Sequence, residues 1–180
     1  MEKLILVDTM DNVIGNADKM SAHLRPVLHR AFSVLLYHEN KVLIQKRATD
    51  KYHSGGLWAN TCCSHPRTLD TKADAIVRLQ EEVGINTSDI EEVFSFVYFA
   101  KYNDNLYEYE YDHVFVGDWQ GVWNINQDEV SDLKWVDIDD LLSNMTINPQ
   151  NYAVWFLSLM PKVAKILKAK NNTILHKNHF

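Results

Sequence analysis

The stretch from Tyr107 to Tyr111 alternates tyrosine with glutamate, and this period of two restricts the segment to an extended strand. Successive side chains of a strand point to opposite faces, so Glu108 and Glu110 share one face and the tyrosines share the other. Two carboxylates side by side repel each other unless they are solvated, protonated or bound to a metal. The spacing alone therefore leaves a solvated acidic face and a metal site open, and it favours the solvated face.

The rest of the chain mixes short apolar runs with a few amphipathic segments. Strands are predicted at residues 4–7, 32–38, 41–46, 93–101, 107–116 and 133–136. A helix is predicted from Thr71, where Thr71 to Asp74 resembles a capping box, to a stop at Gly84. A short helix is expected over 137–142, and a final helical region opens at Pro149 and is kinked or divided at Pro161. This mixture predicts an α/β (α+β) sandwich in which helices flank a mixed β-sheet.

The length and charge of the chain limit its class. A chain of 180 residues fits one domain, 1–180, with a polar tail at 171–180 that we expect to be frayed. The 24 Asp and Glu outnumber the 18 Lys and Arg, and the net charge of −6 argues against a general nucleic-acid binder. A few basic side chains can still gather in one pocket, so an anionic substrate is compatible with this charge.

The sequence also predicts where the protein resides. No apolar run approaches the roughly 18 residues of a membrane span, so we expect no membrane contact. The first residues lack the basic start and long apolar core of a signal peptide. Cys62 and Cys63 are neighbours, and because a disulfide between neighbours would be strained, free thiols in a reducing compartment are favoured. These features predict a cytoplasmic protein.

Two scattered sets of side chains could carry chemistry. His23, His29 and His65, together with Glu108 and Glu110, would suit a divalent transition metal such as Mn²⁺ or Zn²⁺. Cations suit the oxygens of a diphosphate, although scattered Lys and Arg are the rule on any protein surface. The basic set consists of Lys19, Arg47, Lys51 and Arg78.

The end of the predicted helix carries a further motif. Glu81 to Ile85 resembles the last part of the Nudix box, in which carboxylates hold Mg²⁺ against a diphosphate. In that register Cys63 stands where the box has Gly, and Leu69 stands where it has its first Glu. Val77-Arg78 replaces the Arg-Glu pair of the box, so its metal-holding end is retained while the remainder is altered.

Three longer strings carry a more specific resemblance. They cover residues 22–33, 56–66 and 107–115, and the second reads Gly-Leu-Trp-Ala-Asn-Thr-Cys-Cys-Ser-His-Pro. From about Asp8 to Trp155 the chain resembles the type I isopentenyl-diphosphate isomerases, a Nudix-fold family. The pattern Trp-x-Asn-x-x-Cys-x-His-Pro is close to diagnostic of that family, because ordinary Nudix hydrolases have no reactive cysteine there.

The resemblance implies a Nudix-like fold and roles for particular side chains. Mg²⁺ would bridge Glu82 and the substrate diphosphate, which the basic set would also contact. Cys63 and Glu110 would transfer protons, while Tyr98 and Trp155 would be aromatic residues of the pocket. A thiol with an ordinary pKa of about 8.5 needs only a modest shift to exchange a proton near neutral pH. The tightly bound Mn²⁺ or Zn²⁺ would take His23, His29, His65, Glu108 and Glu110.

The activity implied by the resemblance is the isomerisation of isopentenyl diphosphate to dimethylallyl diphosphate in isoprenoid biosynthesis. One proton is added at C4 and another is removed from C2 through a tertiary carbocation, which requires an acid, a base and protection from water. An indole face can stabilise such a cation. The partner would be this small-molecule substrate, and the protein a monomer or weak dimer.

Two other functions remain open at this stage. One is that of a Nudix pyrophosphohydrolase, against which the losses at Leu69 and Val77-Arg78 count. The other is that of a metal- or diphosphate-binding module without catalysis, against which the retention of Cys63 and Glu110 counts.

Overall fold

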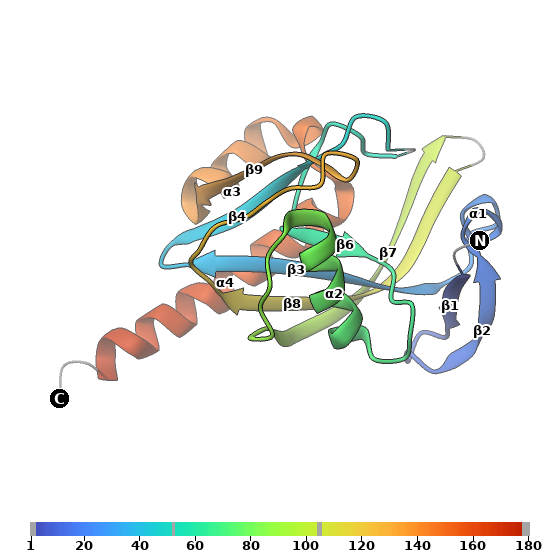
Figure 1. The fold of residues 1–180 in the computed structure, drawn as a ribbon, viewed down its shortest axis with the longest axis horizontal. Coiled ribbons are helices and arrows are strands. Elements are labelled where there is room, and N and C mark those ends of the chain that lie inside the picture. The colour runs from blue at the N-terminus through green and yellow to red at the C-terminus, as the bar shows by residue number, and fades with distance from the viewer. Residues whose placement is uncertain (1–2, 52, 104–105, 178–180) are drawn as a thin grey trace.

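The fold is a curled sheet with helices on both faces (Figure 1). The computed structural model describes residues 3–51, 53–103 and 106–177. Its strands are β1 (Lys3–Val7), β2 (Val13–Asp18), β3 (His29–His38), β4 (Lys41–Arg47), β5 (Trp58–Ala59), β6 (Cys62–Ser64), β7 (Glu91–Asn103), β8 (Leu106–Asp118) and β9 (Val130–Asp137). Its helices are α1 (Lys19–Leu24), α2 (Thr71–Val83), α3 (Ile138–Ile147) and α4 (Val154–Lys177), with a 3-10 turn η1 (Pro149–Asn151).

Strand β3 is the axis of the sheet. It pairs in parallel with β8 and antiparallel with β1, β4 and β6. Its first eight residues are buried, as expected for a strand that is covered on both faces. The long strands β7 and β8 form an antiparallel hairpin, and β9 pairs with β4 on the other side. The predicted α+β sandwich with a mixed sheet is confirmed.

Helices cover the two faces because alternate residues of β3 point to each face. On one face, Val34 and Leu36 pack in a core with Leu79 of α2. On the other face, Leu35 packs in a second core that includes Phe156 of α4. Figure 1 shows α2 and α4 on opposite sides of the sheet. Side chains of α2 and of α4 meet at one cavity beside the sheet.

Helix α2 begins and ends at specific caps. Asp70 is its N-cap and accepts a hydrogen bond of 3.0 Å from the backbone N–H of Ala73, so the cap lies one residue before the predicted Thr71. Asp74 does not reach back as in a capping box, because it accepts hydrogen bonds from Thr68 instead. The predicted stop at Gly84 is confirmed, since this residue is left-handed with φ +68°.

The C-terminal region differs from the sequence prediction. Helix α4 is a single element from Val154 to Lys177 that contains Pro161, so the proline does not divide it. The backbone of 171–177 is helical rather than frayed, while residues 178–180 lie outside the described part. No Gly or Pro follows Pro161, and Asn171 Nδ2 donates a hydrogen bond of 3.1 Å to the Glu39 carbonyl, which ties this segment to the β3–β4 turn.

Among the described helices, none is both long enough and apolar enough to cross a membrane. Helix α4, the longest of them, carries lysines along its course.

Replacing Gly84 with Ala should lower the free energy of unfolding by about 2–4 kcal/mol. Left-handed backbone costs Ala ~1–2 kcal/mol, and a Cβ at this position would lie 2.5 Å from the backbone oxygen of Asn124. Gly56→Ala is the matched control, because Gly56 also has positive φ but its Cβ would meet only the Thr49 methyl group at 3.7 Å. Urea unfolding followed by circular dichroism measures both variants. Equal losses would show that the contact with Asn124 relaxes freely.

Candidate active site

A cavity of about 740 Å³ opens between the sheet, α2 and the start of α4. It brings together most of the side chains singled out in the sequence. The predicted residues that line it are Lys19, Arg47, Lys51, Cys63, His65, Arg78, Glu82, Tyr98, Glu108, Glu110 and Trp155. His29 is fully buried and contacts Glu110. The backbone of His23 lies in α1, but its side chain lies outside the described part of the structure.

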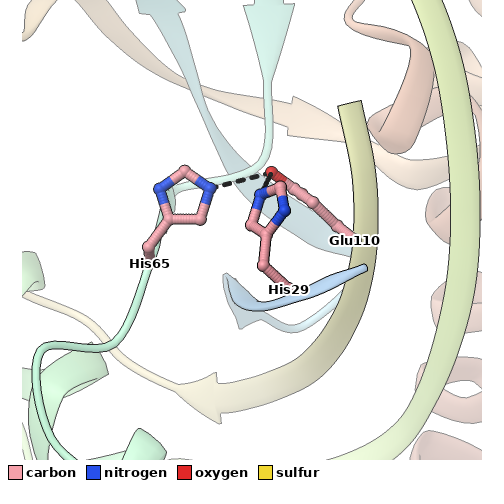
Figure 2. Close-up of side chains that lie close together, drawn as sticks. All are labelled: His29, His65 and Glu110. Carbon is pink, nitrogen blue, oxygen red and sulfur yellow. Dashed lines mark hydrogen bonds and ion pairs between the residues drawn. The ribbon is translucent and has the colours of Figure 1, made fainter. Parts of the chain in front are cut away.

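Two histidines converge on one carboxylate in this cavity (Figure 2). The parallel register of β3 and β8 places His29 opposite Glu110, and His65 follows directly after β6. Glu110 Oε1 lies 2.9 Å from His65 Nε2 and 3.6 Å from His29 Nε2. Burial alone would raise the pKa of Glu110, but the hydrogen bonds from His29 and His65 outweigh it and hold that pKa well below its ordinary value.

The donor set of His29, His65 and Glu110 fits a divalent metal. Each residue offers one ligand atom, and these atoms lie within 4.8 Å of one another. Imidazole nitrogens and a carboxylate oxygen are the usual ligands of Zn²⁺ and related ions. His29 Nδ1 lies 2.9 Å from the Val27 carbonyl, which makes Nδ1 the donor and turns Nε2 towards the group, as in many metal-binding histidines.

Glu108 is held by a different set of partners. Its Oε2 accepts hydrogen bonds from Tyr98 (2.9 Å) and Tyr102 (3.2 Å), and its Oε1 lies 2.6 Å from His53 Nε2. Tyr98 also contacts Glu110 through its hydroxyl. Because a phenol carries one hydrogen, Tyr98 can donate to only one of the two carboxylates at a time. Burial and the neighbouring carboxylates raise the pKa of Tyr98 well above its ordinary value, so it stays protonated.

The acidic face of β8 is buried, so the solvated face that the spacing alone favours is wrong. Glu108, Glu110 and Asp112 occupy alternate positions, and none of the three is more than 7% exposed. Asp112 Oδ2 accepts a hydrogen bond of 2.8 Å from the Ser33 hydroxyl. Burial, followed by the charge of Glu110, raises the pKa of Asp112 well above its usual range. The row of carboxylates is therefore part of the interior.

Cys63 and Cys62 face opposite sides of the sheet. In the register of β6 with β3, Cys63 pairs with Ser33 and lines the cavity, whereas Cys62 is fully buried in the core beside α2. Arg47 Nη1 donates to Cys63 Sγ at 3.4 Å. Burial outweighs this cation and raises the pKa of Cys63 to about 12. The shift is larger than the modest one expected from the sequence, and it keeps Cys63 as a thiol.

Trp155 is both a buried residue and a wall of the cavity. Its Nε1 donates a hydrogen bond of 3.0 Å to Asn60 Oδ1, and the Asn60 amide in turn donates to the Cys62 carbonyl at 2.6 Å. The guanidinium carbon of Arg47 lies 5.2 Å from the centroid of the indole. One asparagine therefore connects the start of α4 to the cysteine segment.

Several cations that line the cavity pair with carboxylates. Arg78 Nη2 donates to Glu82 Oε1 at 2.5 Å and lies 3.5 Å from Glu129 Oε2. Lys51 also contacts Glu129. Burial raises the pKa of Glu82 even though Arg78 opposes the shift. Arg47 and Lys19 line the same space.

Several residues of the site have a role that the sequence analysis missed. Asn60 lies inside one of the three strings, and Asp112 continues the period of Glu108 and Glu110, so both carried a detectable signal. His53 and Glu129 lie in loops with no periodic pattern, and only the three-dimensional structure brings them to the cavity.

Comparison with known proteins agrees with this geometry. A model of the NUDIX domain matches residues 27–156. The chain is 44% identical over 164 residues to a protein of Aromatoleum aromaticum, with 90% of this chain and 86% of the relative covered. It is 47% identical to a protein of Photorhabdus laumondii, with 88% and 90% covered. Both relatives are named isopentenyl-diphosphate Delta-isomerase 2.

The chain belongs to the isopentenyl-diphosphate Delta-isomerase family. A solved structure of a Deinococcus radiodurans protein is similar to it in fold, with a TM-score of 0.72, 16% identity, and 89% of this chain and 98% of that chain covered. The Nudix-like fold and the family resemblance are thus confirmed. A divalent metal at the histidine and carboxylate group is consistent with an isomerase family built on the NUDIX domain.

Asn60→Ala should lower the free energy of unfolding by about 2–4 kcal/mol. The change leaves the buried Trp155 Nε1 and the Cys62 carbonyl without this partner, and an unsatisfied buried polar group costs ~1–3 kcal/mol. In a Trp155→Phe background the same substitution should cost about 1 kcal/mol less, because no indole N–H remains to be satisfied. Urea unfolding of the four proteins of this cycle measures the difference. Strict additivity would show that the Asn60–Trp155 bond contributes nothing.

Proposed function

We propose that this chain isomerises isopentenyl diphosphate to dimethylallyl diphosphate, a step of isoprenoid biosynthesis. The observation that carries the proposal is a single cavity in which a thiol, a phenol–carboxylate pair, an indole and a cluster of cations meet. The names of relatives that are 44% and 47% identical over most of the chain support it.

The cationic end of the cavity binds the diphosphate in this proposal. Arg47 ends β4, Lys51 lies in the loop before β5, and Arg78 projects from α2 towards the same space. Lys19 lies at the start of α1 and lines the same cavity. Guanidinium forks and ammonium groups bind phosphate oxygens through charge-assisted hydrogen bonds. The anchored diphosphate would fix the hydrocarbon half of the substrate against the remaining walls.

Proton transfer falls to Cys63 and Glu110. One adds a proton at C4 of the alkene and the other removes a proton from C2, so the product has the same atoms and the same charge as the substrate. Tyr98 shares its hydroxyl between Glu110 and Glu108, and it can relay a proton to or from Glu110. The buried Trp155 presents an aromatic face that stabilises the tertiary carbocation between the two transfers.

Two metals belong to this proposal. The His29, His65 and Glu110 group, completed by His23 and Glu108, would hold Mn²⁺ or Zn²⁺, and Glu82 would hold Mg²⁺ with the substrate. These ions would supply positive charge that offsets the buried carboxylates and the diphosphate. The chain's own contribution is to orient the ligands, as His29 does through the Val27 carbonyl.

Hydrolysis of a nucleoside diphosphate derivative is the competing activity of this fold. Leu69 stands where the Nudix box has its first Glu, and it is 70% exposed and outside the cavity lining. Arg78 takes the place of a further Glu and pairs with Glu81 and Glu82. Both changes favour isomerisation over hydrolysis.

Three further properties of the chain stay predictions: a single domain, a cytoplasmic location, and a monomeric or weakly dimeric state.

Incubation of the metal-loaded protein with isopentenyl diphosphate and Mg²⁺ in D₂O tests the function. We expect dimethylallyl diphosphate that carries deuterium, because the proton added at C4 comes from groups that exchange with solvent. Deuterium NMR of the product and a phosphate-release assay are the measurements. Release of phosphate without isomerisation would instead identify a pyrophosphohydrolase, and no turnover at all would indicate a binding module.

Cys63→Ala should lower turnover by roughly 10²–10⁴-fold, the typical contribution of a general acid or base. Cys62→Ala should leave turnover within a few fold, because Cys62 points into the core beside α2. Both variants are compared for turnover of isopentenyl diphosphate after their folding and metal content have been checked. If Cys62→Ala were the inactive protein and Cys63→Ala the active one, Cys63 would not be a proton-transfer residue.

A further inference from the structure

His53 lines the active-site cavity and has no assigned role in the proposed reaction. It lies in the loop between β4 and β5, two residues after Lys51, and it is 8% exposed. A buried polar ring is retained when its nitrogens are engaged by partners. The contacts of His53 therefore indicate what the ring does.

The backbone of the loop fixes the position of His53. The N–H of Gly56 donates to the Arg47 carbonyl at 3.1 Å, which closes the loop on the end of β4. A Cβ at Gly55 would lie 2.5 Å from the Thr49 carbonyl oxygen, so the backbone around Gly55 approaches the backbone at Thr49 closely. The imidazole is thus presented to the cavity by a closed loop.

The main polar contact of His53 is with Glu108. His53 Nε2 lies 2.6 Å from Glu108 Oε1, a carboxylate oxygen that accepts from the ring N–H. The other oxygen of Glu108 accepts from Tyr98 and Tyr102. His53 therefore completes a set of three donors that fixes both oxygens of this carboxylate.

The ring of His53 also touches the aromatic wall of the cavity. It meets the Trp155 ring edge-on, with centroids 5.8 Å apart and planes at 81°. Its centroid lies 5.0 Å from that of Tyr102. One side chain therefore joins the carboxylate row of β8 to the indole at the start of α4.

We propose that His53 is a positioning residue for the isomerisation, which acts by holding the Glu108 carboxylate and, through it, the Tyr98 hydroxyl. The inference rests on the proposed function. Without His53, Glu108 Oε1 loses this donor and the carboxylate is held less rigidly, so the Tyr98 hydroxyl that bridges Glu108 and Glu110 is less precisely placed. The cations at the diphosphate end are untouched. The loss should therefore appear in kcat and much less in KM.

Two substitutions separate the hydrogen bond from the ring. His53→Gln can place an amide N–H close to the position of Nε2 but has no ring, and His53→Phe keeps a ring edge against Trp155 but has no donor. His38→Gln is the control, because His38 lies at the end of β3 outside the cavity lining and contacts Asp118. Turnover of isopentenyl diphosphate, transition metal bound per chain and thermal midpoint are measured for each protein.

We expect His53→Phe to lower kcat by about 10–100-fold, which corresponds to the loss of one hydrogen bond to a charged group, with KM changed less than about threefold. His53→Gln should keep most of kcat, and both should bind as much transition metal as the wild type. Equal or higher kcat in His53→Phe than in His53→Gln would overturn the proposal and make the ring a packing element. Loss of metal in both variants would also overturn it and make His53 a ligand.

The wild type distinguishes this inference from the function on which it rests. An active wild type with an unimpaired His53→Phe variant would overturn the role of His53 alone. A folded, metal-loaded wild type that does not isomerise isopentenyl diphosphate would overturn both.

Discussion

The burial of a row of carboxylates on β8 is the constraint on which the rest of the site depends. Glu108, Glu110 and Asp112 occupy alternate positions on one face, and carboxyl groups in an interior are stable only when they are hydrogen-bonded, paired or protonated. Each is met by partners from other elements: Glu110 by the histidine that begins β3 and the one that follows β6, Glu108 by a histidine and two phenols, and Asp112 by the Ser33 hydroxyl. The buried carboxyl groups that need partners in the fold are the same groups that give the cavity its chemistry.

The opposite face of β8 serves the same site indirectly. Tyr109 and Tyr111 pack against a small core of Ile5, Val7 and Leu28. This contact seats the β1–β2 hairpin against the sheet, and α1 follows directly from β2. Helix α1 carries Lys19 to the cavity, so the alternation of β8 organises both the carboxylates and the approach of a cation from the N-terminal region.

Local patterns predicted the parts of the structure that depend on local geometry. The period of two placed Glu108 and Glu110 together, and Gly84 ended α2, because strand faces and left-handed caps are set within a few residues. The solvated face was wrong because burial depends on how α4, which is distant in the sequence, packs on that face of β8. The contact of His53 with Glu108 joins positions 55 residues apart in the sequence, and no local pattern encodes it. The metal and substrate roles came from the family resemblance rather than from spacing.

In the proposed function, the altered Nudix box holds a diphosphate without cleaving it. Arg78 lies three and four residues before Glu81 and Glu82 in α2, and its guanidinium pairs with both. Arg67 adds a bidentate pair with Glu81, at 2.9 and 2.8 Å. In the proposed function these cations place positive charge beside the diphosphate, so this part of the cavity binds the anion and does not activate water against it. In the same proposal, the chemistry at the carbon atoms depends on the thiol of Cys63, the indole of Trp155 and the buried carboxylates, which line the same cavity.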